Sequence, residues 1–178
     1  KGKIIKEWNL TTKLINIFGI ASAMSYLHSL DIIHQNLNPS SILLDDYLHP
    51  KLSGFCSAKF STDKTISFNI GSYVAPEIWK DEECTKASDV YAFGMILYAI
   101  FNESFPFVNL TNPQIVVLVC YKNSRPKINE RVPGAVKRLI ESCWDEDPNH
   151  RPTFDQILNE LENNHSFITD EIDEDLYR

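Results

Sequence analysis

The sequence predicts a single, mainly α-helical domain with about six helices and two small β-hairpins. The chain has 178 residues, of which 43% are hydrophobic; this suffices for one hydrophobic core and is short for two domains. Apolar residues recur at steps of three and four over residues 14–27, and residues 90–101 are apolar nearly all round. Both patterns are typical of helices that face a core. We expect the domain at residues 1–165 and a solvated acidic tail at residues 166–178.

The first half of the chain predicts one long helix followed by short strands. The helix covers residues 14–27, where the apolar steps occur. Short apolar runs follow at residues 32–33, at residues 42–44 and around Leu52. They are separated by turn-forming residues, namely Pro39, Asp45, Asp46 and Pro50. This arrangement favours two small hairpins over a large sheet.

The second half predicts a loop and then further helices. The polar stretch at residues 56–74 predicts a long loop, and a loop of that length is usually functional or disordered. Residues 90–101 predict a helix that is buried on every side. Three later helices are indicated by residues typical of a helix start. Asn112 is the expected cap of a helix that has Pro113 in its first turn, and Pro133 is expected to open another helix. Thr153 and Gln156 form the expected capping box of the third.

The charge of the chain disfavours several classes of function. There are 24 acidic and 17 basic residues, a formal net charge of -7, so the chain repels nucleic acids and anionic lipids. No apolar run approaches the roughly 18 residues that a membrane span requires. We therefore expect no nucleic-acid or membrane partner and a cytoplasmic location. The four cysteines lack metal-binding spacing and are expected to be reduced thiols.

Five segments, in the same order along the chain, resemble protein kinases. Residues 34–44, HQNLNPSSILL, are similar to the catalytic loop, which reads H-R-D-L with an Asn a few residues later. The other four are KLSGFC at 51–56, APE at 75–77, SDVYAFG at 88–94 and, at 143–154, CW through RPTF. The last segment looks most like the tyrosine-kinase-like group. The implied fold is the helical C-terminal lobe of a kinase with small β-hairpins. We expect the N-terminal lobe to be absent, because no Gly-rich loop or V-A-I-K-type lysine precedes these segments.

The resemblance implies that the residues of the phosphoryl-transfer chemistry are replaced. The proton-accepting Asp falls at Asn36, whose amide takes up no proton at neutral pH. One Mg²⁺-binding Asp falls at Gly54, which has no side-chain oxygen, and the second metal-binding residue falls at Ser41. The Lys two places after the catalytic Asp falls at Asn38. We therefore expect no metal site and no cofactor, although the family uses ATP and Mg²⁺.

The resemblance also implies that structural residues are retained. Glu77 and Arg151 match a buried ion pair, and Asp89 matches a carboxylate that accepts backbone N–H groups of the catalytic loop. His34 and Phe55 match stacked packing positions. The floor beneath the adenine of a bound nucleotide falls at Ile42, Leu43 and Leu44, with Leu43 as the contact if any nucleotide binds.

The segment after the catalytic loop departs from the family pattern. Gln35 replaces an Arg that would pair with a phosphorylated loop, so phosphate at Ser61, Thr62 or Thr65 would lack this receiver. The Gly-Thr pair of the family corresponds either to Gly71–Ser72, with two residues deleted, or to Asn69–Ile70.

Three functions fit these observations. A catalytically inactive pseudokinase would act by protein–protein interaction, through helix 112–122 or through the exposed lobe face. An apolar patch around Leu43 and Phe55 on that face would promote aggregation. The second function is a serine/threonine protein kinase of the tyrosine-kinase-like group, of which this sequence is a fragment. The third is a truncated relic without function, which the Lys at position 1 allows.

Overall fold

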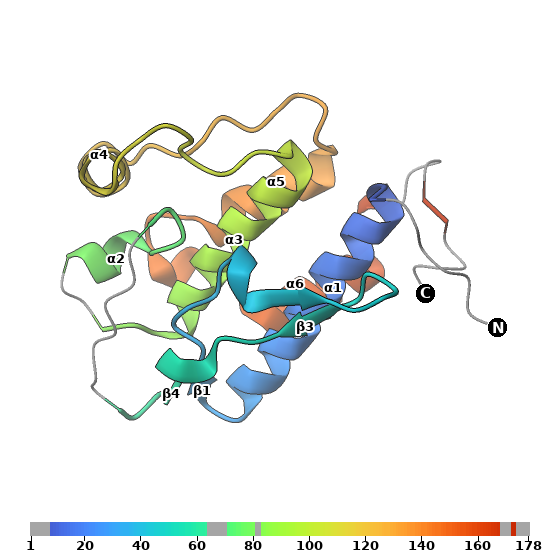
Figure 1. Ribbon diagram of the computed structural model, residues 1–178, viewed down its shortest axis with the longest axis horizontal. Coiled ribbons are helices and arrows are strands. Elements are labelled where there is room, and N and C mark those ends of the chain that lie inside the picture. Colours follow the sequence, from blue (N-terminus) through green and yellow to red (C-terminus); the bar gives the residue numbers. More distant parts are fainter. Residues whose placement is uncertain (1–7, 64–70, 81–82, 168–171, 174–178) are drawn as a thin grey trace.

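The protein is a helical bundle with two small antiparallel sheets (Figure 1). The computed structural model describes residues 8–63, 71–80, 83–167 and 172–173. Within these residues the helices are α1 (Leu10–Ser29), α2 (Pro76–Trp79), α3 (Lys86–Asn102), α4 (Asn112–Val116), α5 (Gly134–Cys143) and α6 (Phe154–Asn163). The strands are β1 (Ile32–Ile33), β2 (Ile42–Leu44), β3 (Pro50–Leu52) and β4 (Lys59–Phe60). The prediction of a mainly helical domain is confirmed.

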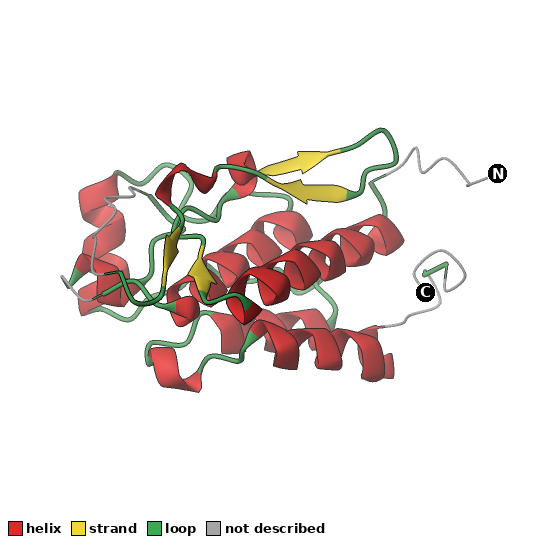
Figure 2. Ribbon diagram, turned by 90° about the horizontal axis from the view of Figure 1, so that it is seen from below, coloured by secondary structure: helices red, strands yellow, loops and turns green. Residues whose placement is uncertain are grey.

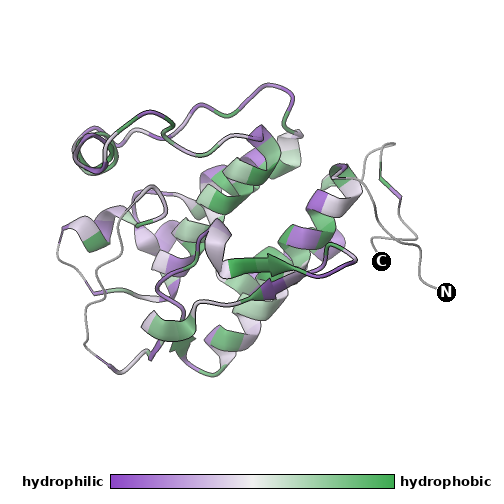
Figure 3. Cartoon of the chain, viewed as in Figure 1, coloured by the Kyte–Doolittle hydropathy of each residue, from purple (hydrophilic) through white to green (hydrophobic). Residues whose placement is uncertain are grey.

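Helix α3 is the centre of the hydrophobic core. Its residues from Ser88 to Tyr98 are all buried, and it packs against α5, while α1 packs against α6. The hydropathy of the chain shows the same arrangement, because the apolar residues gather along α3 and its neighbours (Figure 3). The expected all-round burial of this helix is confirmed, and a capping box of Thr85 with Ser88 starts it at Lys86.

Only one of the two predicted hairpins forms. Strands β2 and β3 pair in antiparallel register, with Ile42 opposite Leu52, and this hairpin runs along one edge of the helices (Figure 2). Strand β1 instead pairs with the distant β4, with Ile32 opposite Phe60. Strand β4 lies inside the stretch predicted to be a loop, because two residues among polar neighbours give no alternating pattern.

The helix starts were predicted with one error. The capping box of Thr153 with Gln156 at α6 is confirmed, and α5 begins directly after Pro133. At α4 the cap is Thr111, not Asn112, because Thr111 and Gln114 satisfy each other's backbone N–H groups reciprocally. This helix continues as a π-helical turn, Val117–Tyr121, close to the predicted end at residue 122.

Two expectations fall partly on residues that the structure does not describe. Thr65 and the pair Asn69–Ile70 lie outside the described residues, as does most of the acidic tail. Among the helices that are described, none combines the length and the apolar character needed to cross a bilayer.

Candidate functional site

The loop between β1 and β2 is anchored by a buried carboxylate of helix α3. Asp89 lies in the first turn of α3 and is 1% exposed. Its Oδ2 accepts the backbone N–H of His34 at 2.8 Å, and its Oδ1 accepts that of Gln35 at 2.9 Å. The imidazole of His28 lies 3.0 Å from Oδ2. These bonds hold Gln35 in a left-handed conformation, φ 64°, which is uncommon for a residue with a side chain.

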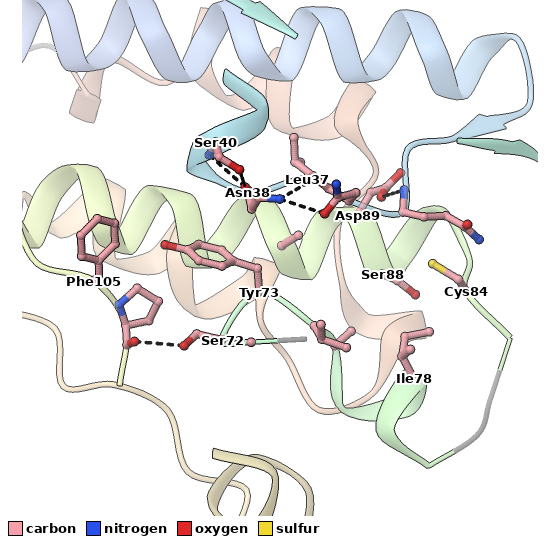
Figure 4. A pocket seen from close by; sticks show the side chains of 17 residues that line it. Leu37, Asn38, Ser40, Ser72, Tyr73, Ile78, Cys84, Ser88, Asp89 and Phe105 are labelled. Atoms are coloured by element: carbon pink, nitrogen blue, oxygen red, sulfur yellow. Dashed lines mark hydrogen bonds between the residues drawn. The ribbon is translucent and has the colours of Figure 1, made fainter. Parts of the chain in front are cut away.

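The polar side chains of this loop bond to one another. Asn38 Nδ2 donates to the carbonyl of Asn36 at 2.8 Å and to its side-chain Oδ1 at 2.9 Å. Asn38 Oδ1 accepts the backbone N–H of Ser40 at 2.9 Å, which caps the short 3₁₀ helix Pro39–Ser41 (Figure 4). Ser41 Oγ donates to the carbonyl of Asn38 at 2.8 Å. Asn36, Asn38 and Ser41 therefore form one neutral network.

Gly54 brings the second half of the site against this network. It has φ 79°, a left-handed conformation that favours glycine. A Cβ atom at Gly54 would lie 3.2 Å from Ser41 Cβ and 3.9 Å from Asn36 Nδ2. The backbone N–H of Ser53 also donates to the carbonyl of Ser41 at 2.8 Å. The structure thus brings together Asn36, Ser41 and Gly54, which the sequence placed at the metal-binding and proton-accepting positions.

This side-chain set does not fit a magnesium ion. Mg²⁺ is usually held by one or two carboxylates and can also use amide oxygens. Here no position offers a carboxylate, Gly54 has no side chain, and Asn36 Oδ1 already accepts a hydrogen bond from Asn38 Nδ2. The Ser41 hydroxyl already donates to Asn38 and accepts the Asn38 N–H at 3.0 Å. Among the residues that the structure describes, no group of three or more His, Cys, Asp or Glu side chains is arranged to hold a metal ion.

His34 and Phe55, which were expected to stack, lie side by side. The leucines that were expected to lie beneath a bound nucleotide are exposed. The His34 and Phe55 rings are 5.0 Å apart between centroids, and the His34 imidazole also lies 2.9 Å from the Ser53 carbonyl. Leu43 is 56% exposed, Leu44 45% and Phe55 46%. We call these three side chains the open apolar face. The expected exposure of apolar side chains around Leu43 and Phe55 is confirmed.

A buried ion pair ties α2 to the segment before α6. Arg151 Nη1 and Nη2 donate to the two carboxylate oxygens of Glu77 at 2.7 and 2.8 Å. Arg151 also donates to the carbonyls of Ala87 and Asp145, and Ser88 Oγ donates to Glu77. The structure thus contains the ion pair that was expected to be buried, and its geometry is bidentate, with every charged group hydrogen-bonded.

A cleft of about 490 Å³ opens beside the neutral network. Residues 35–38 form one wall, residues 71–75 another, and Phe105 with Pro106 a third (Figure 4). Ser72 Oγ donates to the carbonyl of Pro106 at 3.1 Å and so ties two of these walls together. Of the two pairs considered for the family's Gly-Thr position, Gly71–Ser72 lines this cleft.

Two potential nucleophiles that line the cleft, Cys84 and Tyr73, are in environments that keep them protonated. Burial raises the pKa of the Cys84 thiol to about 12, so the thiol stays protonated at neutral pH. Burial likewise raises the pKa of the Tyr73 phenol. The sequence reasoning missed Tyr73, Cys84 and Phe105, because they come from separate loops that only tertiary folding brings together.

The comparisons with known proteins agree with the motifs. Residues 5–161 match the family described as protein tyrosine and serine/threonine kinase. The chain is 36% identical to a probable serine/threonine-protein kinase of Dictyostelium discoideum over 80% of its own length and 16% of the relative's. It is 34% identical to the serine/threonine/tyrosine-protein kinase HT1 of Arabidopsis thaliana over 86% of its own length and 40% of the relative's. The chain therefore spans less than half of either relative.

Proposed function

The chain belongs to the protein tyrosine and serine/threonine kinase family, and from that premise we propose that it is a pseudokinase domain, which binds other proteins and transfers no phosphate. The observation that carries the proposal is the meeting of Asn36, Ser41 and Gly54 at one point. Kinases need a carboxylate base for the substrate hydroxyl and carboxylate or amide oxygens for two metal ions. None of these three positions supplies a carboxylate.

The loss of these groups is chemically severe. Removal of a general base alone lowers a rate by roughly 10²–10⁴-fold. Asn36 cannot act as that base, and its Oδ1 already accepts a hydrogen bond from Asn38. Gly54 could regain a carboxylate only in a left-handed backbone and only 3.2 Å from Ser41 Cβ. Among the described residues, the carboxylate that lines the adjoining cleft is Asp89, and its two oxygens already accept the backbone N–H groups of His34 and Gln35.

The intact scaffold supports a binding role. Asp89 still holds the loop, and the Glu77–Arg151 pair still ties α2 to the core. A domain that keeps its packing without its charged site retains a defined surface. We propose two surfaces for protein partners: the helix and π-helical turn from Asn112 to Tyr121, and the open apolar face. ATP and Mg²⁺ have no part in this function, and a cytoplasmic location agrees with the reduced cysteines that we expect.

The second candidate is a serine/threonine protein kinase. It is favoured by the names of the relatives, which are serine/threonine-protein kinases or, for HT1, a serine/threonine/tyrosine-protein kinase. This candidate requires a phosphoryl-transfer site built without a carboxylate at positions 36 and 54. The two candidates differ in one measurable property, the binding of nucleotide with metal.

The deciding experiment is a thermal-shift titration of the chain with ATP, with and without Mg²⁺. Ligands that bind the folded state raise its unfolding temperature. We expect no Mg²⁺-dependent shift at millimolar ATP. A saturable shift that requires Mg²⁺ would contradict the pseudokinase proposal and favour the kinase.

A phosphate-transfer assay with radiolabelled ATP and a general protein substrate completes the test. The matched control is Asn36→Ala, which removes the amide at the position of the base and leaves the fold anchored by Asp89. We expect no transfer from either protein. Transfer that disappears in Asn36→Ala would identify Asn36 as part of a working site and overturn the proposal, whereas a signal equal in both proteins comes from a contaminant.

A further inference from the structure

One exposed segment of this acidic protein is basic. Residues 122–138 contain six of the 17 Lys and Arg residues of the chain and one of its 24 acidic residues. The segment follows the π-helical turn, crosses one side of the bundle as a loop and enters the first turn of α5 (Figure 1). Its exposed cationic side chains, which we call the basic surface, are Lys122, Lys127, Arg131, Lys137 and Arg138.

Most of the basic surface has no counter-charge within the protein. Lys137 lies 4.0 Å from the carboxylate of Glu141. The other four members of the basic surface form no ion pair with any acid in the part of the chain that the structure describes. Like charges gathered on one surface repel one another, so a partner that brings negative charge removes an unfavourable interaction.

The segment is held in place from beneath. Arg125 Nε donates to the carbonyl of Trp144 at 2.9 Å, so this arginine anchors the loop. The side chain of Ile128 is buried, and the backbone N–H of Asn129 donates to Asn102 Oδ1 at 2.7 Å. A partner would therefore meet a formed surface, and binding would cost little ordering entropy.

Arg131 also lines a polar pocket of about 340 Å³ between α1, the end of α3 and the loop before α5. Lys13 and Glu103 line the same pocket, and their charged groups lie 2.6 Å apart, so these two charges neutralise each other. Arg131 therefore supplies the unpaired charge among the described lining residues. A carboxylate side chain fits a pocket with this charge and polar walls.

The composition of the segment indicates which kind of anionic partner fits. Residues 122–138 contain no Phe, Tyr or Trp on which nucleic-acid bases could stack. The Ile and Val side chains of the segment are buried, so none is left to enter a membrane. Extended polyanions would also meet the acidic remainder of the chain, which repels them. An acidic peptide segment needs to contact only the basic surface, and cations spread along a loop suit an extended peptide.

We propose that the basic surface binds an acidic segment of a partner protein, with one carboxylate in the pocket beside Arg131. Complementary charge selects the partner and speeds its association. The inference rests on the proposed function only in taking protein binding as the role of the domain. It adds a third surface to the two proposed above.

Fluorescence anisotropy of a fluorescein-labelled hexaglutamate peptide, titrated with the 178-residue chain, tests the proposal. We expect saturable binding that weakens as NaCl is added, because salt screens exposed charges. A hexaglutamine peptide of the same length should not bind. Equal binding of the two peptides, or hexaglutamate binding that salt does not weaken, would overturn the proposal.

Two double variants with the same change in net charge locate the surface. Lys127→Glu with Arg131→Glu should weaken hexaglutamate binding by about tenfold or more. The matched control, Lys51→Glu with Lys80→Glu, changes exposed lysines outside the segment and should alter the affinity by less than about threefold.

The control also shows how the experiment can fail. Equal effects of the two double variants would mean that the net charge of the chain governs binding, and would overturn the assignment to the basic surface. Should the charge reversal disturb the fold, Lys127→Gln with Arg131→Gln removes the same two positive charges without adding negative ones. This variant should still weaken binding by about threefold or more.

Other anionic occupants are distinguished in the same assay. An oligothymidylate or a phosphatidylserine vesicle that binds as tightly as hexaglutamate would overturn the preference for a peptide. The acidic tail of the chain is a third occupant, because the backbone N–H of Asp173 donates to Thr11 Oγ1 at the start of α1. The tail variant replaces the acids of residues 170–175 by Asn and Gln. Binding that appears only in this variant would assign the basic surface to the tail, and no binding in either chain would also overturn the proposal.

The proposed pseudokinase and the basic surface can fail separately. Mg²⁺-dependent binding of ATP would overturn the pseudokinase without changing the hexaglutamate titration. A chain that binds no hexaglutamate and shows no shift with ATP would overturn the basic surface and leave the pseudokinase in place.

Discussion

Single residues of the candidate site show how a neutral loop can satisfy its own hydrogen bonds. The side chains of Asn36 and Asn38 pair directly, amide to amide. An amide carries both a donor and an acceptor, so two of them satisfy each other without an ion. The buried charged groups also have hydrogen-bond partners, at Asp89 and in the Glu77–Arg151 pair. The loop is therefore held by satisfied polar groups, both neutral and charged.

The Glu77–Arg151 pair gives a prediction at this scale. Glu77→Gln should lower the free energy of unfolding by about 3–5 kcal/mol, because it leaves the buried Arg151 guanidinium without its counter-charge. Urea unfolding followed by circular dichroism measures this change. The control is Glu141→Gln, which breaks an exposed pair with Lys137 at 4.0 Å and should cost less than about 1 kcal/mol. Equal effects of the two variants would mean that the buried pair contributes no more than a surface pair.

The contact between helices α3 and α5 gives a prediction at the scale of elements. A Cβ atom at Gly94 would lie 2.8 Å from Cys143 Cβ and 3.3 Å from the backbone N of Trp144. Gly94→Ala should therefore push the end of α5 away from α3 and cost about 1–3 kcal/mol, as overpacked cores do. The helix propensity of alanine acts in the opposite direction and does not remove the clash.

The unfolding temperatures of Gly94→Ala and Gly134→Ala test whether the close approach of α3 and α5 requires glycine at position 94. A Cβ at Gly134 meets only the flexible end of Arg138, at 3.6 Å, so that variant should be neutral or slightly more stable. If Gly94→Ala is as stable as Gly134→Ala, close approach of the two helices is not what requires glycine at position 94.

The elements also show which parts of the fold the sequence predicts. Helix α1 was predicted because its apolar residues recur at steps of three and four, and helix α3 because its residues are apolar nearly all round. Strands β1 and β4 were not recognised as partners, because each has two residues and their pairing joins distant segments. The cap of α4 was misplaced by one residue because Thr111 and Asn112 are both good caps, and only the reciprocal bonds with Gln114 select Thr111.

The candidate site was predictable to the extent that it is local. Asn36, Asn38 and Ser41 lie in one motif, and the hairpin of β2 with β3 brings Gly54 back to them. The cleft beside them was not predictable, because residues 71–75 and Phe105 reach it through separate connections. The spacing of residues along the chain predicts which residues meet within a short loop. It does not predict which distant segments a long loop brings together.

At the scale of the whole molecule, the open apolar face should cause the chain to self-associate without a defined stoichiometry. The open apolar face consists of Leu43 and Leu44 on strand β2 with the half-exposed Phe55, and exposed apolar patches beside strands promote less specific association. We therefore expect the chain to form assemblies larger than a dimer as its concentration rises.

Light scattering on a concentration series checks this expectation. The double variant Leu43→Asp with Leu44→Asp should remove the large species and leave the monomer, because it places two charges at exposed positions of strand β2. Tyr26→Asp is the control, since Tyr26 is 65% exposed on α1 and lies outside the open apolar face. If the unchanged chain stays a single small species throughout the series, or if Tyr26→Asp is as effective as the double variant, the open apolar face is not the origin of association. Loss of the large species in the double variant alone would assign it to strand β2, the strand expected to lie beneath a bound nucleotide in the kinase family.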